Sequence, residues 1–352
     1  MQIALDAQAG DFGAVPNLKG AIRAVEELDC KILLVGQESV LRTELEKLGH
    51  KTGDKLQIVN SERPVDMSSE PAKIVRENPN SSIMVCASLV AEGKADGMVS
   101  AGNSGATMVA SLAKMKRVKN ISRPAIAFPF PTTKGVSVIL DGGANIDCKP
   151  RHLLEFALMG SLYSKYAFGV KNPSIGILSV GEEESKGNLL VRESTALLKQ
   201  SILNFHGPIE GRDIPFGTTD VVVCDGFVGN VVLKLSEGLS KAMFNAIKAE
   251  ISKKLSYKIG ALMLKKAFRG VKDNFDPEKH GGAPLLGVGG ITIVCHGKSG
   301  ENAIFNSIKR VCNFAKVKMN NSISEGIEKL NDVLEKSSMD DALSHSENVI
   351  AG

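Results

Sequence analysis

Short apolar runs alternate with longer amphipathic stretches along most of the chain. Such runs predict buried parallel strands, because a strand covered on both faces carries near-continuous aliphatic residues. They lie at residues 2–6, 31–35, 56–59, 96–100, 136–140, 174–180, 220–224 and 291–296. Helical periodicity separates them at residues 16–28, 38–48, 82–92, 104–114, 151–168, 187–200 and 228–250. The alternation predicts an α/β fold in three layers, with a mostly parallel sheet covered by helices on both faces.

The length and composition fit one large α/β unit or two closely joined lobes. The chain has 352 residues, of which 43% are hydrophobic, and its net charge of +4 comes from 43 basic and 39 acidic residues. That balance does not indicate a nucleic-acid partner. We expect residues 1–332 to form a single catalytic unit. The polar residues 333–352 are expected to form a flexible tail without a catalytic role.

The cysteines and the first residues predict a cytoplasmic protein. The six cysteines include no CxxC pair, which is typical of reduced thiols. The start of the chain lacks the pattern of a signal peptide, and no apolar run is long enough to span a membrane. His206, His280 and His296 lack the spacing of zinc ligands, so no metal and no cofactor is expected. Cys148 or Cys224 acting as a nucleophile with His296 is an alternative.

Polar, glycine-rich turns follow six of the predicted strands. Ligands of open α/β sheets bind at the carboxyl ends of the strands, so we expect these turns to lie at one edge and form a single site. The turns read DAQAGDFG (6–13), SAGNSGAT (100–107), DGGANIDCKP (141–150), GEEESKGN (181–188), DGFVGN (225–230) and HGKSG (296–300).

The SAGNSGAT turn is a candidate anion site. Gly102 and Gly105 leave backbone N–H groups accessible at the start of a predicted helix, and Asn103 and Ser104 add side-chain donors. The turn has neither the lysine of a P-loop nor a GxGxxG fingerprint, so it favours a small anion over a nucleotide. The alternative is a glycine turn that only lets the helix and strand pack closely.

The GEEESKGN turn sets one lysine beside three acids. After a strand, Lys186 could face a bound anion or a developing oxyanion. The alternative is a surface ion pair with Glu182, Glu183 or Glu184. Those three acids could bind Mg²⁺, but solvated acids at a helix start fit adjacent carboxylates better.

Two further turns offer side-chain amides and carboxylates. Asn230 follows two glycines at a sharp turn into a helix and could donate to a carbonyl oxygen. Asp225, Asn145 and Asp147 lie in the same two turns. The alternative for all of them is helix capping.

Residues 251–272 contain seven basic residues and no acid. Lys258, Lys265 and Lys272 recur every seven residues, which predicts one basic face on an amphipathic helix. Such a helix indicates a membrane surface or an acidic partner, and an ordinary core-facing helix is the alternative.

Several of these stretches occur in an order that is specific when taken together. They are SAGNSGA, RPA at 123–125, DGGANIDCKP, GEEESKGN, EGRDI at 210–214, DVVVCDGFVGNVVLK and GGAPLLGV at 281–288. From Met1 to about Phe314 the chain resembles the bacterial phosphate acyltransferases of phospholipid synthesis. The resemblance implies transfer of a long acyl group from acyl carrier protein to inorganic phosphate. It also implies a homodimer with a fold like isocitrate and isopropylmalate dehydrogenases, peripheral membrane association, and a downstream acyltransferase that uses the acyl phosphate.

The resemblance also implies roles for the candidate residues. Lys186 and Asn230 would stabilise the charge that develops on the thioester oxygen. Phosphate would bind at Gly102, Asn103, Ser104 and Gly105, and Asn145, Asp147 and Asp225 would orient these groups. Acyl carrier protein or the membrane would contact Lys258, Lys265, Lys266, Phe268 and Arg269.

The chain departs from the family pattern at two places. The first turn has Gln8 and Ala9 where the family has methionine and glycine, and Ala9 would be strained only at a positive φ. Asn78 stands where the family has a lysine two residues after the arginine that aligns with Arg76. Two other functions are alternatives: a metal- and NAD-dependent dehydrogenase of the same fold, and a non-catalytic membrane-associated scaffold.

Overall fold

The computed structural model describes residues 1–62, 64–71, 73, 77–274 and 277–350. Its described strands form two sheets instead of the one that was expected. The larger has the order β3 (Leu56–Asn60), β2 (Lys31–Gly36), β1 (Gln2–Asp6), β4 (Gly97–Ser100), β12 (Ile291–Val294), β11 (Ala283–Leu286) and β5 (Ala125–Ile126). The smaller has the order β6 (Phe128–Thr132), β7 (Gly135–Leu140), β10 (Val221–Val223), β8 (Ile175–Leu178) and β9 (Phe205–Ile209).

Parallel pairing dominates both sheets, as the apolar runs predict. Antiparallel pairs occur only at margins among the described strands, where β11 pairs with β12 and β5, and β6 pairs with β7. The eight predicted strands all form. The helices are α1 (Ala14–Glu27), α2 (Glu38–Lys47), α4 (Ser82–Ala91), α5 (Ser104–Met115), α6 (Pro150–Phe168), α7 (Leu189–Gln200), α8 (Gly226–Ser252), α9 (Leu255–Met263), α10 (Lys265–Asn274), α11 (Glu301–Lys316) and α12 (Met319–Ile350).

One continuous hydrophobic core joins the two sheets. It contains Leu5 and Ile293 from the larger sheet together with Leu140 and Val223 from the smaller one. Helix α6 contributes many of its residues to this core and packs against β7, β10 and α11. Each Å² of apolar surface that this core removes from water stabilises the folded protein by about 25 cal/mol.

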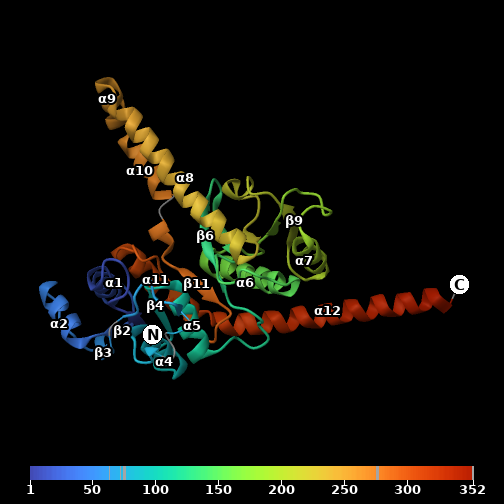
Figure 1. The fold of residues 1–352 in the computed structure, drawn as a ribbon, viewed down its shortest axis with the longest axis horizontal. Coiled ribbons are helices and arrows are strands. Elements are labelled where there is room, and N and C mark those ends of the chain that lie inside the picture. Colours follow the sequence, from blue (N-terminus) through green and yellow to red (C-terminus); the bar gives the residue numbers. More distant parts are fainter. Residues whose placement is uncertain (63, 72, 74–76, 275–276, 351–352) are drawn as a thin grey trace.

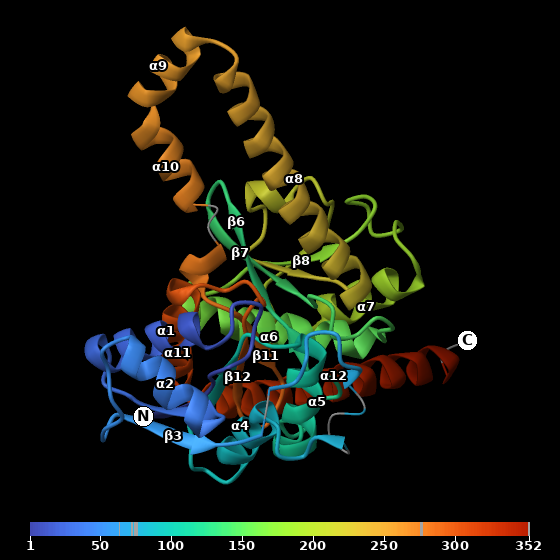
Figure 2. The ribbon, with the colours of Figure 1, turned by 60° about the vertical axis from the view of Figure 1, so that its left-hand side comes forward.

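A helical arm projects from the body (Figures 1 and 2). Helix α8 forms its outgoing side, and α9 and α10 return alongside it. The basic segment 251–272 is therefore not one helix, because α8 ends at Ser252 and a second break falls at Leu264. Lys258 lies on α9 and Lys265 begins α10, so the heptad spacing does not give one continuous basic face.

The C-terminal residues continue α12 as a helix to Ile350, through part of the range expected to form a tail. Figure 1 shows this helix extending away from the body. None of the helices, in the portion of the chain that is described, combines the length and apolar character needed to cross a bilayer.

Candidate active site

The six polar turns form two groups of three, because the strands before them belong to two sheets. In the larger sheet β1, β4 and β12 are parallel neighbours, with Ser100 in register with both Asp6 and Val294. The turns after these strands therefore meet at one edge. The Asp11 N–H donates to the Gly297 carbonyl at 2.7 Å, which ties the first turn to the last.

The glycine turn after β4 is closely packed. A Cβ on Gly105 would lie 2.6 Å from Cγ of Pro71, so only glycine fits there without movement. Asn103 caps α5 by accepting from the Ala106 N–H at 3.0 Å, and its Nδ2 donates to the Met67 carbonyl at 2.8 Å. Its amide is thus engaged in holding the turn. The Ser104 side chain is exposed at the first position of α5 and makes no hydrogen bond within the described part of the protein.

Below this turn lies Asp6, which the sequence analysis did not single out. Its Oδ2 accepts from Ser100 Oγ at 2.8 Å, and Ser100 Oγ accepts from the Gly102 N–H at 3.1 Å. Burial raises the pKa of the Asp6 carboxyl group to about 6, and the hydrogen bond from the Ser100 hydroxyl offsets only part of that effect. Asp6 therefore supports the glycine turn through Ser100.

The unusual first turn is accommodated without strain. Ala9 is buried and has no positive φ, so the alanine costs little in that conformation. Gln8 accepts from the Gln37 N–H at 2.6 Å. The buried Asn17 donates to the carbonyls of Ala9 and Gly13 at 2.8 and 3.1 Å. The other departure from the family pattern is Asn78, two residues after Arg76. Arg76 lies outside the described residues.

The second group of turns follows β7, β10 and β8, which are parallel neighbours in the smaller sheet. The fully buried Asp141 organises it. Its carboxylate accepts from five donors, the N–H groups of Ile126, Gly143, Ala144 and Asn145 and the side-chain amide of Asn145. Burial raises the pKa of Asp141, and these hydrogen bonds offset part of that rise. Asn145 is thus a structural element of the turn, whereas Asp147 is exposed.

Helix α8 begins directly against this turn. Asp225 caps it by accepting from the Val228 N–H at 2.9 Å. A Cβ on Gly229 would lie 1.9 Å from the carbonyl oxygen of Asp141, so the helix can approach only because that position is glycine. Asn230 lies beside Gly143, where an added Cβ would be 3.4 Å from Cβ of Asn230. Its side chain is exposed and, among the residues described, its amide has no hydrogen-bond partner.

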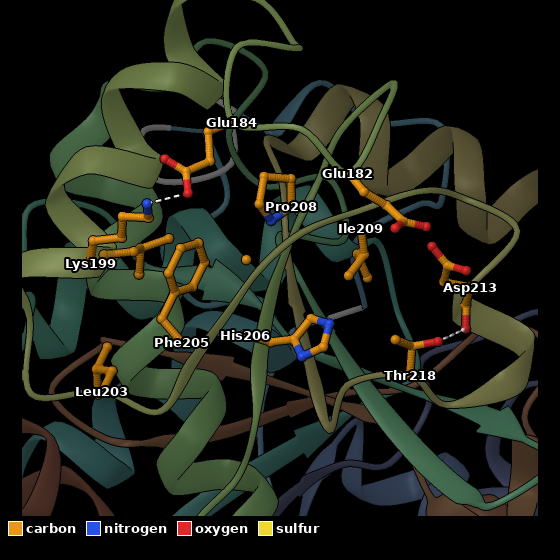
Figure 3. Close-up of a pocket in the computed structure, with 12 residues that line it drawn as sticks. Glu182, Glu184, Lys199, Leu203, Phe205, His206, Pro208, Ile209, Asp213 and Thr218 are labelled. Carbon is orange, nitrogen blue, oxygen red and sulfur yellow. Dashed lines mark hydrogen bonds and ion pairs between the residues drawn. The ribbon is translucent and has the colours of Figure 1, made fainter.

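Lys186 is exposed in the turn after β8, and the acids around it pair elsewhere. Glu184 pairs with Lys199 (Figure 3). A carboxylate oxygen of Glu182 lies 3.9 Å from the guanidinium group of Arg212. The ammonium group of Lys186 has no ion-pair partner within the described chain. The backbone N–H of Lys186 donates to the Glu183 carbonyl at 2.9 Å, a hydrogen bond that closes the turn. The surface-ion-pair alternative for Lys186 is therefore not what the structure adopts.

A hollow of about 450 Å³ lies behind the same turn, between β9 and the end of α7 (Figure 3). Its lining includes Glu182, Glu184, Phe205, His206 and Asp213. None of the candidate catalytic or phosphate-binding side chains lines it. The candidate chemistry therefore lies on the turns, outside this hollow.

The cysteine-nucleophile alternative is poorly supported. Burial raises the pKa of Cys148 to about 12, and burial also holds the pKa of Cys224 well above its ordinary value. Both thiols are protonated at neutral pH and are weak nucleophiles.

Comparison with known proteins supplies the family. Residues 1–322 match the family model described as "Fatty acid synthesis protein". Over 336 residues the chain is 51% identical to a protein of Elusimicrobium minutum (strain Pei191) named "Phosphate acyltransferase", covering 96% of this chain and 98% of the relative.

Solved structures show the same fold at low sequence identity. A phosphotransacetylase from Streptococcus pyogenes is similar with a TM-score of 0.60 and 20% identity, over 93% of this chain and 94% of that one. A 4-hydroxythreonine-4-phosphate dehydrogenase from Klebsiella pneumoniae is similar with a TM-score of 0.50 and 12% identity, over 90% and 97%.

The fold and its polar turns thus define an α/β protein of the architecture shared by phosphotransacetylases and by this dehydrogenase. Within that class, the chain belongs to the family of fatty acid synthesis proteins whose relatives are named phosphate acyltransferase. The resemblance drawn from the ordered motifs is confirmed.

Proposed function

We propose that this enzyme transfers a long acyl group from the thioester of acyl carrier protein to inorganic phosphate, giving an acyl phosphate for phospholipid synthesis. The name of its relatives supports the reaction class. The observation that carries the proposal for the site is the unpaired state of Lys186 and Asn230. Both are exposed donors on neighbouring turns of one sheet edge, and neither has a partner among the described residues.

In the proposed reaction, a phosphate oxygen attacks the thioester carbonyl carbon and the thiolate of the carrier leaves. A thioester is already activated, so the enzyme has to orient the two reactants, and this can contribute about 7–11 kcal/mol. Lys186 and Asn230 donate to the oxyanion of the tetrahedral intermediate. Phosphate is bound at the Gly102–Gly105 turn by the Ser104 hydroxyl and by backbone N–H groups other than that of Gly102, which donates to Ser100, while Asn103 holds the turn in place.

Asn145, Asp147 and Asp225 have supporting roles in this proposal. Asn145 and Asp225 fix the turn and the start of α8 through the hydrogen bonds described above. Phosphate at neutral pH already has anionic oxygens, so none of these residues is needed as a general base.

The helical arm is proposed to contact acyl carrier protein and the membrane surface. Helix α9 has no buried residue, and Leu255, Leu262 and Met263 are 74%, 70% and 83% exposed. Basic side chains flank this apolar surface, which suits an acidic protein and anionic lipid. They include Lys258, Lys265, Lys266 and Arg269, next to Phe268 on α10. The acyl phosphate would pass from this surface to a downstream acyltransferase.

A homodimer is proposed from a second apolar stripe. Val231, Leu235, Leu239 and Met243 recur every four residues on α8 and are all about half or more exposed. A stripe of this kind is covered when a second copy packs on it. We further propose that the helices and sheets stack in the three layers of isocitrate and isopropylmalate dehydrogenases.

The test is phosphate-dependent release of free thiol from palmitoyl acyl carrier protein. We expect the wild type to release thiol only with phosphate, and Lys186→Ala and Asn230→Ala each to lower kcat by about 10²–10³ because each removes one donor to the oxyanion. Lys171→Ala, at an exposed lysine before β8, is the control and should keep wild-type activity. Thiol release that ignores phosphate would make the protein a thioesterase and contradict the proposal.

A further inference from the structure

Arg123, in the RPA stretch before β5, is held between helix α6 and the turn after β7. The backbone N–H and hydroxyl of Ser122 donate to the carboxylate of Glu155 at 2.8 and 2.9 Å. On the other side, Nδ2 of Asn145 donates to the Pro124 carbonyl at 2.7 Å. Glu155 is fully buried on α6. The backbone at position 123 is therefore fixed on both sides, against α6 and against the 141–148 turn.

The guanidinium group at this fixed position is free. The side chain of Arg123 is exposed, and it makes no hydrogen bond or ion pair within the described structure. The neighbouring carboxylate of Glu155 is already used by Ser122 and by Nε of Arg151 at 3.0 Å. An arginine held in place without a partner offers a planar fork of donors, which matches the oxygens of a phosphate group.

The charge of Arg123 shifts the pKa of two neighbouring groups. Burial raises the pKa of Cys148, and the charge of Arg123 partly offsets that rise. Burial lowers the pKa of His152, the charge of Glu155 opposes that shift, and the charges of Arg123 and Lys149 add to it. His152 is thereby kept neutral, and its Nδ1 accepts from the Lys149 N–H at 3.1 Å.

None of the acids nearby forms an ion pair with Arg123 among the described residues. Asp141 is buried and accepts five hydrogen bonds, and Asp225 caps α8. Asp147 is the exposed acid of the same turn, and no ion pair joins it to Arg123 among the described residues. Arg123 and Lys149 are thus two exposed cations, and the described structure shows no ion pair for either of them.

We propose that Arg123 binds a phosphate oxyanion of a substrate beside the 141–150 turn. The inference deepens the proposed function and rests on it. Two substrates carry the required chemistry: inorganic phosphate, and the phosphodiester through which the donor's prosthetic arm is attached to the carrier protein.

The test compares Arg123→Gln and Arg123→Lys with the wild type and with Arg42→Gln. Arg42 lies on α2 in a surface ion pair with Glu38 at 2.7 Å, so Arg42→Gln controls for the loss of one surface guanidinium. The first measurement is the thermal unfolding midpoint with increasing sodium phosphate at constant ionic strength. The second is the separate KM for phosphate and for palmitoyl acyl carrier protein.

Arg123→Gln is expected to raise one KM by about tenfold or more, the size of a lost charge-assisted contact, with kcat changed less. A raised KM for phosphate identifies the free anion, and a raised KM for the carrier protein identifies the phosphodiester. The KM of Arg123→Lys should lie between those of the wild type and Arg123→Gln, because lysine keeps the charge but not the planar fork of donors. If Arg123 binds the free anion, phosphate raises the unfolding midpoint of the wild type and raises it less in Arg123→Gln.

Both KM values within about twofold of those of Arg42→Gln would overturn the assignment. If Arg123→Gln does not fold, Arg123→Lys decides by the same criteria. Failure of the proposed function is a separate result: the wild type would then release no thiol with phosphate. The unfolding midpoint still tests Arg123 in that case: loss of the stabilisation by phosphate in Arg123→Gln supports binding of the free anion, and equal stabilisation of both proteins refutes it.

Discussion

At the scale of single residues, Asp6 places a buried carboxyl group directly under a turn proposed to bind an anion. A negative charge there would be costly to bury and would repel the phosphate. Burial accordingly favours the protonated form of Asp6. The Cys86 thiol nearby adds no charge, because burial holds its pKa well above the ordinary value. Asp6 therefore supports the turn by accepting the hydrogen bond from Ser100, and not through a negative charge.

This arrangement predicts a pH dependence of stability. The folded protein keeps the Asp6 proton up to pH about 6, whereas the unfolded chain releases it near the ordinary pKa of 3.8. Between these values the folded state binds more protons, so the free energy of unfolding should fall as pH rises, by about 3 kcal/mol in total. Asp6→Asn cannot titrate and should lack this component.

The measurement is urea unfolding of both proteins from pH about 4 to about 7. Other titrating groups cancel in the difference between the two proteins. A difference that stays constant across this range would show that Asp6 does not carry the raised pKa.

At the scale of elements, apolar periodicity predicted the central strands and the helices that cover them. The strands it did not predict include both edges of the smaller sheet. Strand β6 (FPFPT) has two prolines and β9 (FHGPI) has a glycine and a proline, residues that interrupt a strand pattern and are tolerated at an edge. Strand β5 has two residues and leaves no period to detect. Division into two sheets depends on long-range pairing, which local patterns do not encode.

The same limit applies to the candidate site. The turns and the identities of Lys186 and Asn230 could be recognised from the sequence, since polar residues after apolar runs indicate them. The absence of a protein partner for these side chains within the described chain could not be recognised. For Lys186, it depends on the ion pair that Glu184 forms with Lys199 in the folded protein. Arg123 and Asp6 were passed over for this reason: an arginine or an aspartate becomes distinctive only when its partners, or their absence among the described residues, are known.

The start of α8 makes a prediction about a single methyl group. Gly229→Ala would place Cβ 1.9 Å from the Asp141 carbonyl oxygen, against a turn fixed by five hydrogen bonds. We expect a loss of about 1–3 kcal/mol in the free energy of unfolding and lower turnover, because Asn230 is the next residue. Urea unfolding and thiol release measure the two effects.

Gly238→Ala is the matched control on the same helix. Nothing lies within 4 Å of its added Cβ, so it should stabilise the protein by up to about 1 kcal/mol through helix propensity. Equal effects of the two substitutions would mean that close packing at Gly229 is not what requires glycine.

At the scale of the whole molecule, α8 separates two tasks. Asn230 is near its start, and the helix continues to Ser252, about 33 Å further along at 1.5 Å per residue. Figures 1 and 2 show the arm leaving the body over this length. Donor capture by the arm should therefore be separable from chemistry at the turns.

Charge reversal on the arm tests this separation. Lys258 and Lys265 are exposed and form no ion pair among the described residues, so they are available to an acidic carrier protein. With both changed to Glu, we expect KM for palmitoyl acyl carrier protein to rise about tenfold at low salt, because attraction becomes repulsion. Because exposed charges are screened over about 10 Å at 0.1 M salt, the difference should shrink as salt is added, while kcat stays near the wild-type value.

The control carries the same change in net charge on the body, at the exposed Lys51 and Lys171. If overall charge steered the carrier protein, the two double variants would raise KM equally. If the arm is the docking surface, only its variant will do so. If the KM of the arm variant is independent of salt, or if its kcat falls while its KM does not rise, the arm does not bind the donor. Because the assay contains no vesicles, any effect found reports the protein partner and not the membrane.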